Sequence, residues 1–259
     1  MNISTTPSEA CVDSKFKPVF TRSPGLHDAT THYCPGCGHG IAHRLVAEVV
    51  DELGIHHRTI GIAPVGCAVL AYNYLNVDMI EVAHGRAPAV ATGMKRTNPD
   101  NIIFSYQGDG DLASIGAAEI LHAAHRAEHL TVIFINNAVY GMTGGQMAPT
   151  TLEHQITQTT PRGRDSRTDG FPLRVSELLA VLPGALYVER CALSTPARIR
   201  QTKKALTHAF RLQIDDAPGL ALVEVLSPCP TYWRLSPPQA MQWIENEMTK
   251  AFPLGKLKG

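Results

Sequence analysis

The chain has 259 residues, 44% of them hydrophobic, and its 23 basic residues balance its 23 acidic ones. This length allows one large α/β core, and the absence of repeats or low-complexity blocks predicts a single domain over residues 1–259. The zero net charge without a basic cluster argues against a nucleic-acid partner, and the lack of a long apolar run argues against a membrane span.

Residues 1–32 are polar and contain prolines, and we expect them to form an arm over a neighbouring surface. They lack the basic segment followed by an apolar one that marks a secretory signal. A reducing cytoplasm is therefore the expected location. In that compartment the six cysteines point to metal or redox chemistry more than to disulfides.

After the arm, helical and strand-like segments alternate. Residues 40–53 have helical spacing and are followed by Gly54, a common helix terminator. Residues 59–63 are typical of a short strand, and residues 85–96 of a helix that packs closely through small side chains. This alternation is the first sign of an α/β protein.

Two short β-branched and aromatic runs follow, residues 102–106 and 131–135, and both are typical of buried parallel strands. Residues 113–125 between them have helical spacing. The predicted helix would carry an apolar stripe of Ile115, Ile120 and Leu121. A strand, a crossover helix and a parallel strand place the carboxyl ends of both strands at one edge of the sheet, where α/β proteins bind ligands.

Polar residues lie directly at those two strand ends. The first run leads into Gly-Asp-Gly-Asp at residues 108–111, and the second into Asn-Asn at residues 136–137. Asp109 can supply a carboxylate and Asn137 a side-chain carbonyl, which are ligands that Mg²⁺ takes together with phosphate oxygens. The glycines allow the backbone to approach phosphates closely. The stretch therefore predicts a Mg-diphosphate site, although two turns that merely end strands would share part of the pattern.

The second half continues the alternation. We predict strands over residues 186–191 and 220–226, and a helix over residues 196–212. Residues 230–259 would form a tail that faces a partner and contains one amphipathic helix, residues 238–251. Together these elements predict a doubly wound, mostly parallel sheet.

A polar segment rich in Thr and Arg, residues 149–171, has no regular pattern. A loop of that length in a compact domain is usually functional or faces a partner. Its Arg162, Arg164 and Arg167 could contact a partner, contact a substrate or remain solvated.

Four of the six cysteines have a glycine or proline next to them in the sequence. Cys34 and Cys37 form a C-x-x-C, while Cys67 and Cys229 each follow a predicted strand. Four thiolates suit an iron–sulfur cluster or zinc, and unrelated thiols remain a third reading. Cys11 and Cys191 have no such neighbour and are expected in the arm and in a buried strand.

Six motifs stand in one order along residues 30–240: YCPGCGHG, IAPVGC, HGRAPAVATG, QGDGD, NNAVYGMTGGQ and LSPCP. The GDG and NN pair resembles the thiamine diphosphate signature. The full series resembles the β subunit of 2-oxo acid:ferredoxin oxidoreductases. The resemblance implies a thiamine diphosphate-binding fold, specifically the domain that binds the diphosphate.

The resemblance also implies ligands for each cofactor. Magnesium would be held by Asp109, Asn137 and the backbone carbonyl of Val139. The 4Fe–4S cluster would be held by Cys34, Cys37, Cys67 and Cys229. Thiamine diphosphate would lie against Val65, Gly66, Cys67, Ala68, His84, Gly110, Asp111, Gly141 and Met142. His39, His43, His56 and His57 have no comparable frame and are expected on the surface or in the core.

The implied reaction is the oxidative decarboxylation of a 2-oxo acid to acyl-CoA and CO₂, with coenzyme A as co-substrate and electrons passing through the cluster to ferredoxin. An α subunit would supply the glutamate that activates thiamine, and γ and ferredoxin-like δ subunits are further expected partners. The favoured substrates are 2-oxoglutarate or a branched-chain 2-oxo acid, and the apolar residues 69–71 offer no cation for a second carboxylate. Two alternatives are a non-redox thiamine decarboxylase or synthase subunit with structural zinc, and a non-catalytic phosphate-binding assembly subunit.

Overall fold

One seven-stranded sheet organises the computed structural model, which describes residues 19–259. The strand order is β2-β1-β3-β4-β6-β5-β7, and β7 pairs antiparallel with β5 whereas the other pairs are parallel. The strands are β1 (Thr59–Ala63), β2 (Asp78–Glu81), β3 (Ile102–Gly108), β4 (Thr131–Asn136), β5 (Ala185–Ala192), β6 (Leu220–Leu226) and β7 (Gly255–Lys258). The prediction of a doubly wound, mostly parallel sheet is therefore confirmed.

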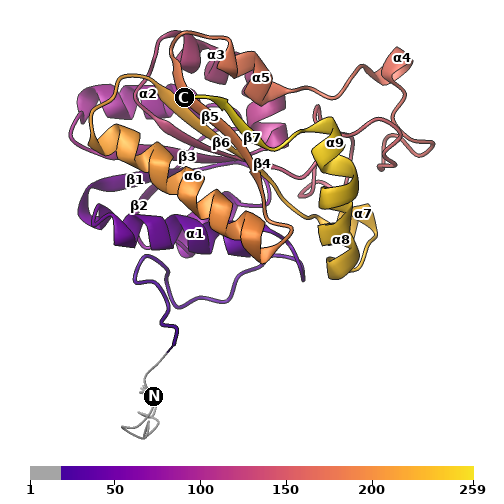
Figure 1. The fold of residues 1–259 in the computed structure, drawn as a ribbon, viewed down its shortest axis with the longest axis horizontal. Helices are drawn as coiled ribbons and strands as arrows, with labels where there is room; N and C mark the ends of the chain where they lie inside the picture. Colours follow the sequence, from indigo (N-terminus) through magenta and orange to yellow (C-terminus); the bar gives the residue numbers. More distant parts are fainter. Residues whose placement is uncertain (1–18) are drawn as a thin grey trace, which may run out of the picture.

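Helices cover both faces of this sheet (Figure 1). The longer ones are α1 (His39–Glu52), α2 (Ala87–Thr97), α3 (Ala117–His125), α5 (Val175–Ala180), α6 (Pro196–Ile214) and α8 (Pro237–Trp243). The shorter ones are η1 (His56–Arg58), η2 (Val69–Asn73), η3 (Gly110–Ile115), α4 (Ser166–Asp169), α7 (Pro230–Trp233), η4 (Ile244–Met248) and α9 (Thr249–Ala251). The predicted helices over 40–53, 85–96 and 196–212 correspond to α1, α2 and α6.

The two faces have separate cores because successive side chains of a strand point to opposite sides. In β4, Ile133 and Ile135 pack under α1 and α6, whereas Val132 and Phe134 pack under α3 and α5. All six residues of β4 are buried. This explains why the central strands are continuous apolar runs without a polar face.

The predicted helix over 113–125 is interrupted. A π-helical turn, η3, begins directly after Asp109, and α3 starts only after Gly116. Of the predicted apolar stripe, Ile120 is buried, but Ile115 and Leu121 are 48% and 43% exposed. The stripe prediction was wrong for these two residues: the break at Gly116 places Ile115 in a separate helical turn, and Leu121 lies about 100° round α3 from the buried Ile120.

Both edge strands were missed. In β2 three of the four residues are exposed, and β7 has the sequence Gly-Lys-Leu-Lys. Neither has the apolar or alternating pattern that identifies a strand. Each is held by its neighbour in the sheet, β1 or β5.

The C-terminal segment packs on the chain itself, and its predicted helix over 238–251 corresponds to α8, η4 and α9. The apolar side chains of Ile244, Met248 and Phe252 are fully buried against Ala138 and Leu226, among others. Contact of its outer side with a partner stays a prediction. The predicted arm, residues 1–32, falls partly outside the described residues, as does Cys11. Among residues 19–259, no helix combines the length and the apolarity needed to cross a membrane.

Candidate functional site

The predicted motifs meet at one edge of the sheet, at the carboxyl ends of four adjacent parallel strands. β1 leads to Cys67, β3 to Asp109, β4 to Asn137 and β6 to Cys229. A cleft of about 610 Å³ opens there. Its lining includes all the predicted thiamine and magnesium residues: Val65, Gly66, Cys67, Ala68, His84, Asp109, Gly110, Asp111, Asn137, Val139, Gly141 and Met142. Residues from five separate motifs therefore share one concave surface.

Asp109, Asn137 and Val139 form what we call the oxygen site. One end of the Asn137 side-chain amide lies 2.7 Å from the Val139 carbonyl oxygen and 3.3 Å from Asp109 Oδ2. With the nitrogen at that end, the amide donates to both oxygens. With the oxygen there, its spacings from the other two oxygens are close to the ~3 Å between neighbouring ligands of an octahedral Mg²⁺. The three groups fit a magnesium ion.

The Asp109 carboxyl is buried and firmly oriented. Its Oδ1 accepts a hydrogen bond from the Gly110 N–H at 2.8 Å, while Oδ2 accepts from Thr150 Oγ1 at 2.7 Å and from the Val139 N–H at 3.2 Å. Burial raises the pKa of Asp109 to about 6, although these hydrogen bonds oppose the shift. A cation beside the carboxyl would offset the cost of burying its charge.

The second glycine of the GDG motif is required by packing. A Cβ at Gly110 would lie 2.1 Å from the Tyr140 ring, which is closer than two carbon atoms can approach. Tyr140 follows Asn137 and Val139 of the oxygen site and also lines the cleft. The glycine thus lets the two predicted motifs come into contact.

Asp111 acts on the cleft through His84. Its Oδ1 pairs with His84 Nδ1 and accepts from the Gly85 N–H at 2.8 Å, and Oδ2 accepts from Gln107 Nε2 at 2.8 Å. Asp111 is only 2% exposed, whereas the His84 side chain is 39% exposed. The carboxylate therefore orients the His84 ring.

Cys34, Cys37, Cys67 and Cys229 form what we call the cysteine cage, because all four line one cavity of about 410 Å³ beside the cleft. All four are free thiols. A Cβ at Gly141 would lie 3.0 Å from Cys67 Sγ and 3.8 Å from Cys229 Sγ. The glycine therefore keeps open the space next to both sulfurs.

The electrostatics of the cysteine cage favour a positively charged ligand. Burial first, and then the neighbouring cysteines, raise the pKa of both Cys67 and Cys229 to about 12. Such thiols become thiolates only when a bound metal supplies positive charge. Within residues 19–259, no three His, Cys, Asp or Glu side chains are arranged to hold a single metal ion. Four thiols around one cavity are a ligand set that suits an iron–sulfur cluster or zinc.

Histidines and tyrosines pack behind the cysteine cage. Tyr33 stacks on His39, whose Nδ1 is 2.8 Å from Tyr106 Oη, and Tyr33 Oη is 3.3 Å from His43 Nε2. Burial lowers the pKa of His39 to about 4 and that of His43 to about 3. Both are therefore neutral core histidines, as expected, but His39 also lines the cleft.

Sequence reasoning missed several residues at the site. Thr150 and Trp233 contact the oxygen site, because Thr150 bonds to Asp109 and Trp233 Nε1 donates to the Asn137 carbonyl at 3.0 Å. His32 Nε2 lies 2.9 Å from the Cys67 carbonyl oxygen. None of the three belongs to a recognisable motif, since each reaches the site through the fold.

The three arginines of the long loop behave differently from one another. Arg164 is 4% exposed and donates to the backbone carbonyls of Ala148, Pro149, Thr151, Asp169, Gly170 and Phe171. It therefore holds the loop together, a role that sequence reasoning did not consider. Arg167 is exposed and pairs with Asp165, and Arg162 is exposed.

Comparisons with known proteins agree with this geometry. Residues 64–225 match the profile of the thiamine pyrophosphate enzyme, C-terminal TPP binding domain. Ketoisovalerate oxidoreductase subunit VorA of Methanothermobacter thermautotrophicus is 52% identical over 236 residues, which cover 91% of this chain and 49% of that protein. The chain thus spans about half the length of that relative. 2-Oxoglutarate synthase subunit KorB of Methanocaldococcus jannaschii is 37% identical over 203 residues, which cover 78% of this chain and 70% of that protein.

A solved structure is also similar. It is 2-oxoglutarate:ferredoxin oxidoreductase from Magnetococcus marinus with 2-oxoglutarate, coenzyme A and succinyl-CoA bound. The match has a TM-score of 0.71 and 28% sequence identity, and it covers 83% of this chain and 69% of that one.

Proposed function

This chain belongs to the thiamine diphosphate-dependent family of 2-oxo acid:ferredoxin oxidoreductase β subunits, and from this membership we propose that it carries the diphosphate-binding half of an active site. The reaction converts a 2-oxo acid and coenzyme A to acyl-CoA and CO₂, and two electrons pass to ferredoxin. The observation that carries the proposal is the meeting of the oxygen site and the cysteine cage at one edge of the sheet. Cys67 lines both cavities.

The oxygen site would hold Mg²⁺ between Asp109, Asn137 and Val139, and the ion would anchor the diphosphate. When bound, thiamine diphosphate supplies the electron sink that lets the bond between the carboxylate and keto carbons break. Asp111 fixes the His84 ring toward this cleft. Asp109 keeps its carboxylate charged at neutral pH when the ion is present, because a neighbouring cation lowers a carboxyl pKa.

The cysteine cage would hold a 4Fe–4S cluster. Its place beside the cleft supports direct electron transfer from the reacting centre. The iron content of the purified protein tests this assignment. We expect a brown protein with about four irons per chain after purification without air. One zinc and no iron would instead indicate the non-redox alternative.

We propose a branched-chain 2-oxo acid as the substrate and 2-oxoglutarate as the second candidate. Within residues 19–259, no lysine or arginine lines the cleft, so the chain offers no cation for a second carboxylate. Residues 69–71, next to the cleft-lining Ala68, are apolar. The 52% identity to a ketoisovalerate oxidoreductase subunit supports the same choice.

We propose that a partner completes the site. No glutamate lines the cleft in the part of the chain that the structure describes, and thiamine activation requires one near the aminopyrimidine. We propose that an α subunit supplies it, with γ and ferredoxin-like δ subunits completing the enzyme. The cytoplasmic location expected from the sequence stays a prediction.

A substrate panel on the assembled enzyme tests the proposed function. Reduction of ferredoxin or a viologen dye would be followed with 2-oxoisovalerate, 2-oxoglutarate, pyruvate and an aryl 2-oxo acid, each with coenzyme A. We expect the highest kcat/KM for 2-oxoisovalerate. Turnover without dye reduction would contradict the redox assignment, and higher kcat/KM for 2-oxoglutarate would contradict the substrate choice.

A further inference from the structure

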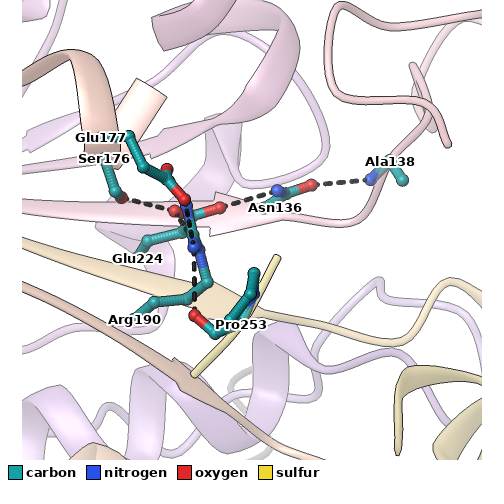
Figure 2. A network of polar contacts seen from close by, with 7 residues as sticks. All are labelled: Asn136, Ala138, Ser176, Glu177, Arg190, Glu224 and Pro253. Carbon is teal, nitrogen blue, oxygen red and sulfur yellow. Dashed lines mark hydrogen bonds and ion pairs between the residues drawn. The ribbon is translucent and has the colours of Figure 1, made fainter. Parts of the chain in front are cut away.

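Asn136, the first residue of the NN pair, lies behind the oxygen site and does not line the cleft. It is fully buried at the end of β4. Its Nδ2 donates to Glu224 Oε1 at 2.8 Å, and its Oδ1 accepts from the Ala138 N–H at 3.1 Å (Figure 2). The side chain therefore connects β6 to the turn that follows β4.

Glu224 and Arg190 continue this connection into the core (Figure 2). Glu224 Oε2 accepts from Arg190 Nε at 2.7 Å and from the Ser176 hydroxyl. Arg190 also donates to Glu177 at 2.9 and 2.5 Å and to the Pro253 carbonyl at 3.1 Å. The side chains of Arg190 and Glu224 are each only 1% exposed.

Ala138 is where this network acts on the turn. It has a φ of +57°, in the left-handed region that residues with a Cβ rarely adopt. Three hydrogen bonds hold it there: its N–H donates to Asn136, and its carbonyl accepts from Thr151 Oγ1 at 2.8 Å and Gln155 Nε2 at 3.1 Å. Ala138 lies between Asn137 and Val139, so its conformation decides where their oxygens point.

We propose that Asn136, Glu224 and Arg190 are positioning residues, which hold the 136–139 turn so that the oxygens of Asn137 and Val139 converge with Asp109 on the metal. The proposal rests on the magnesium site proposed above. Burying an ion pair is seldom needed for stability alone, because apolar residues of similar volume often serve equally well. The Arg190–Glu224 pair lies directly behind the turn, and a positioning role explains why a buried ion pair stands at this place.

The test measures metal binding in the full chain. Mn²⁺ replaces Mg²⁺, thiamine diphosphate is saturating, and the signal of free Mn²⁺ in electron paramagnetic resonance gives the dissociation constant. N136D places a second carboxylate against Glu224 and removes the donated hydrogen bond. We expect it to weaken Mn²⁺ binding about 10- to 100-fold, the usual range for a residue that orients a metal ligand.

A double variant that exchanges the donor and the acceptor at positions 136 and 224 tests whether N136D acts by moving the turn or by a general loss of structure. In N136D/E224Q, position 224 donates to position 136, and the number of carboxylates in the network returns to its original value. We expect this double variant to bind Mn²⁺ within about threefold of the wild type. E177Q is the matched control, because it weakens the Arg190 pair on the side away from the turn. It should lower the thermal unfolding midpoint but leave Mn²⁺ affinity unchanged.

The outcomes distinguish this proposal from the proposed function. If the wild-type chain binds no Mn²⁺ with thiamine diphosphate, the metal site itself is wrong. If the wild type binds and N136D binds equally well, the positioning role is wrong and the metal site stands. The positioning role is also wrong if N136D/E224Q fails to recover affinity while it unfolds at the same temperature as the wild type.

Discussion

The oxygen site and the cysteine cage lie side by side, yet the chain supports them in different ways. At the oxygen site, Asp109 accepts three hydrogen bonds, and the turn that carries Asn137 is hydrogen-bonded to Asn136, which contacts a buried ion pair. In the cysteine cage, Cys34 is exposed and Cys37 is half-buried on a turn before α1. The chain therefore orients the oxygen site through its own hydrogen bonds, whereas two of the four cage cysteines lie on a turn nearer to solvent.

The surroundings of the two sites also differ in charge. A paired arginine and glutamate stand behind the oxygen site. Neutral histidines and tyrosines stand behind the cysteine cage, where burial lowers the histidine pKa values. The two regions should consequently respond separately to mutation and to pH.

The largest effect is expected for Asp109→Ala, because it removes the carboxylate that we propose as a metal ligand and the acceptor for Thr150, Gly110 and Val139. Loss of a ligand should exceed the 10- to 100-fold cost of losing a residue that only orients one. We expect Mn²⁺ affinity with thiamine diphosphate to fall at least about 100-fold, and turnover with it. Asp109→Asn, which keeps the shape but loses the charge, should fall similarly.

The iron content of the same variants decides whether the two regions are independent. Iron per chain should remain unchanged in Asp109→Ala, since none of its lost contacts reaches a cysteine. Loss of iron together with metal affinity would show that the oxygen site also organises the cysteine cage.

Cys229→Ser is the complementary change. Cys229 is buried, and serine is a poor ligand for iron, so we expect the cluster to be lost on purification without air. Mn²⁺ affinity with thiamine diphosphate should stay within about threefold of the wild type. Cys191→Ser is the matched control, because Cys191 is also buried but lies outside the cage. It should retain its iron.

Acid should lower the stability of the folded chain through His43, which lies behind the cysteine cage. Its pKa is lowered from 6.5 to about 3 because the ring is buried, and its Nδ1 has no hydrogen-bond partner. Between these two pH values the unfolded chain binds a proton that the folded chain does not, so stability falls as pH falls. From pH 7 to 5 the loss attributable to His43 is about 2 kcal/mol.

Urea unfolding at pH 7 and pH 5 measures this effect. His43→Leu should lose less stability on acidification than the wild type, by about 2 kcal/mol. His57→Gln is the control, since His57 is an exposed histidine outside this cluster. An equal pH dependence in His43→Leu and the wild type would contradict the assignment of the neutral histidine.

The sequence predicted the central strands and the meeting of Asp109 and Asn137 well, because these features depend on local pattern and on the rule that parallel strands end at one edge. The grouping of the four cysteines was expected only from the family resemblance. It could not predict that Asn136 faces Glu224, since 88 residues separate them. The same holds for Thr150 and Trp233, which reach the oxygen site only through the fold. The edge strands and the break at Gly116 were missed because pairing and packing, not local composition, determine them.

Trp233 is the residue that joins the two regions, and its removal should have the smallest effect of this series. It follows Cys229 in α7, and its Nε1 donates to the Asn137 carbonyl at 3.0 Å. Trp233→Phe keeps an aromatic ring that packs against Trp243 but loses this hydrogen bond. A single hydrogen bond contributes about 0.5–1.5 kcal/mol, which corresponds to an effect of about 2- to 12-fold on affinity.

We expect Mn²⁺ affinity to fall about 2- to 12-fold. Trp233 bonds to the backbone carbonyl of Asn137, and the side-chain amide of the same residue belongs to the oxygen site, so a shift of one moves the other. Iron content should not change. Trp243→Phe alters the same aromatic pair but removes no hydrogen bond to the oxygen site. It should bind Mn²⁺ like the wild type. If Trp233→Phe instead loses iron, the segment after Cys229 is held in place by the oxygen site. The oxygen site would then also organise the cysteine cage.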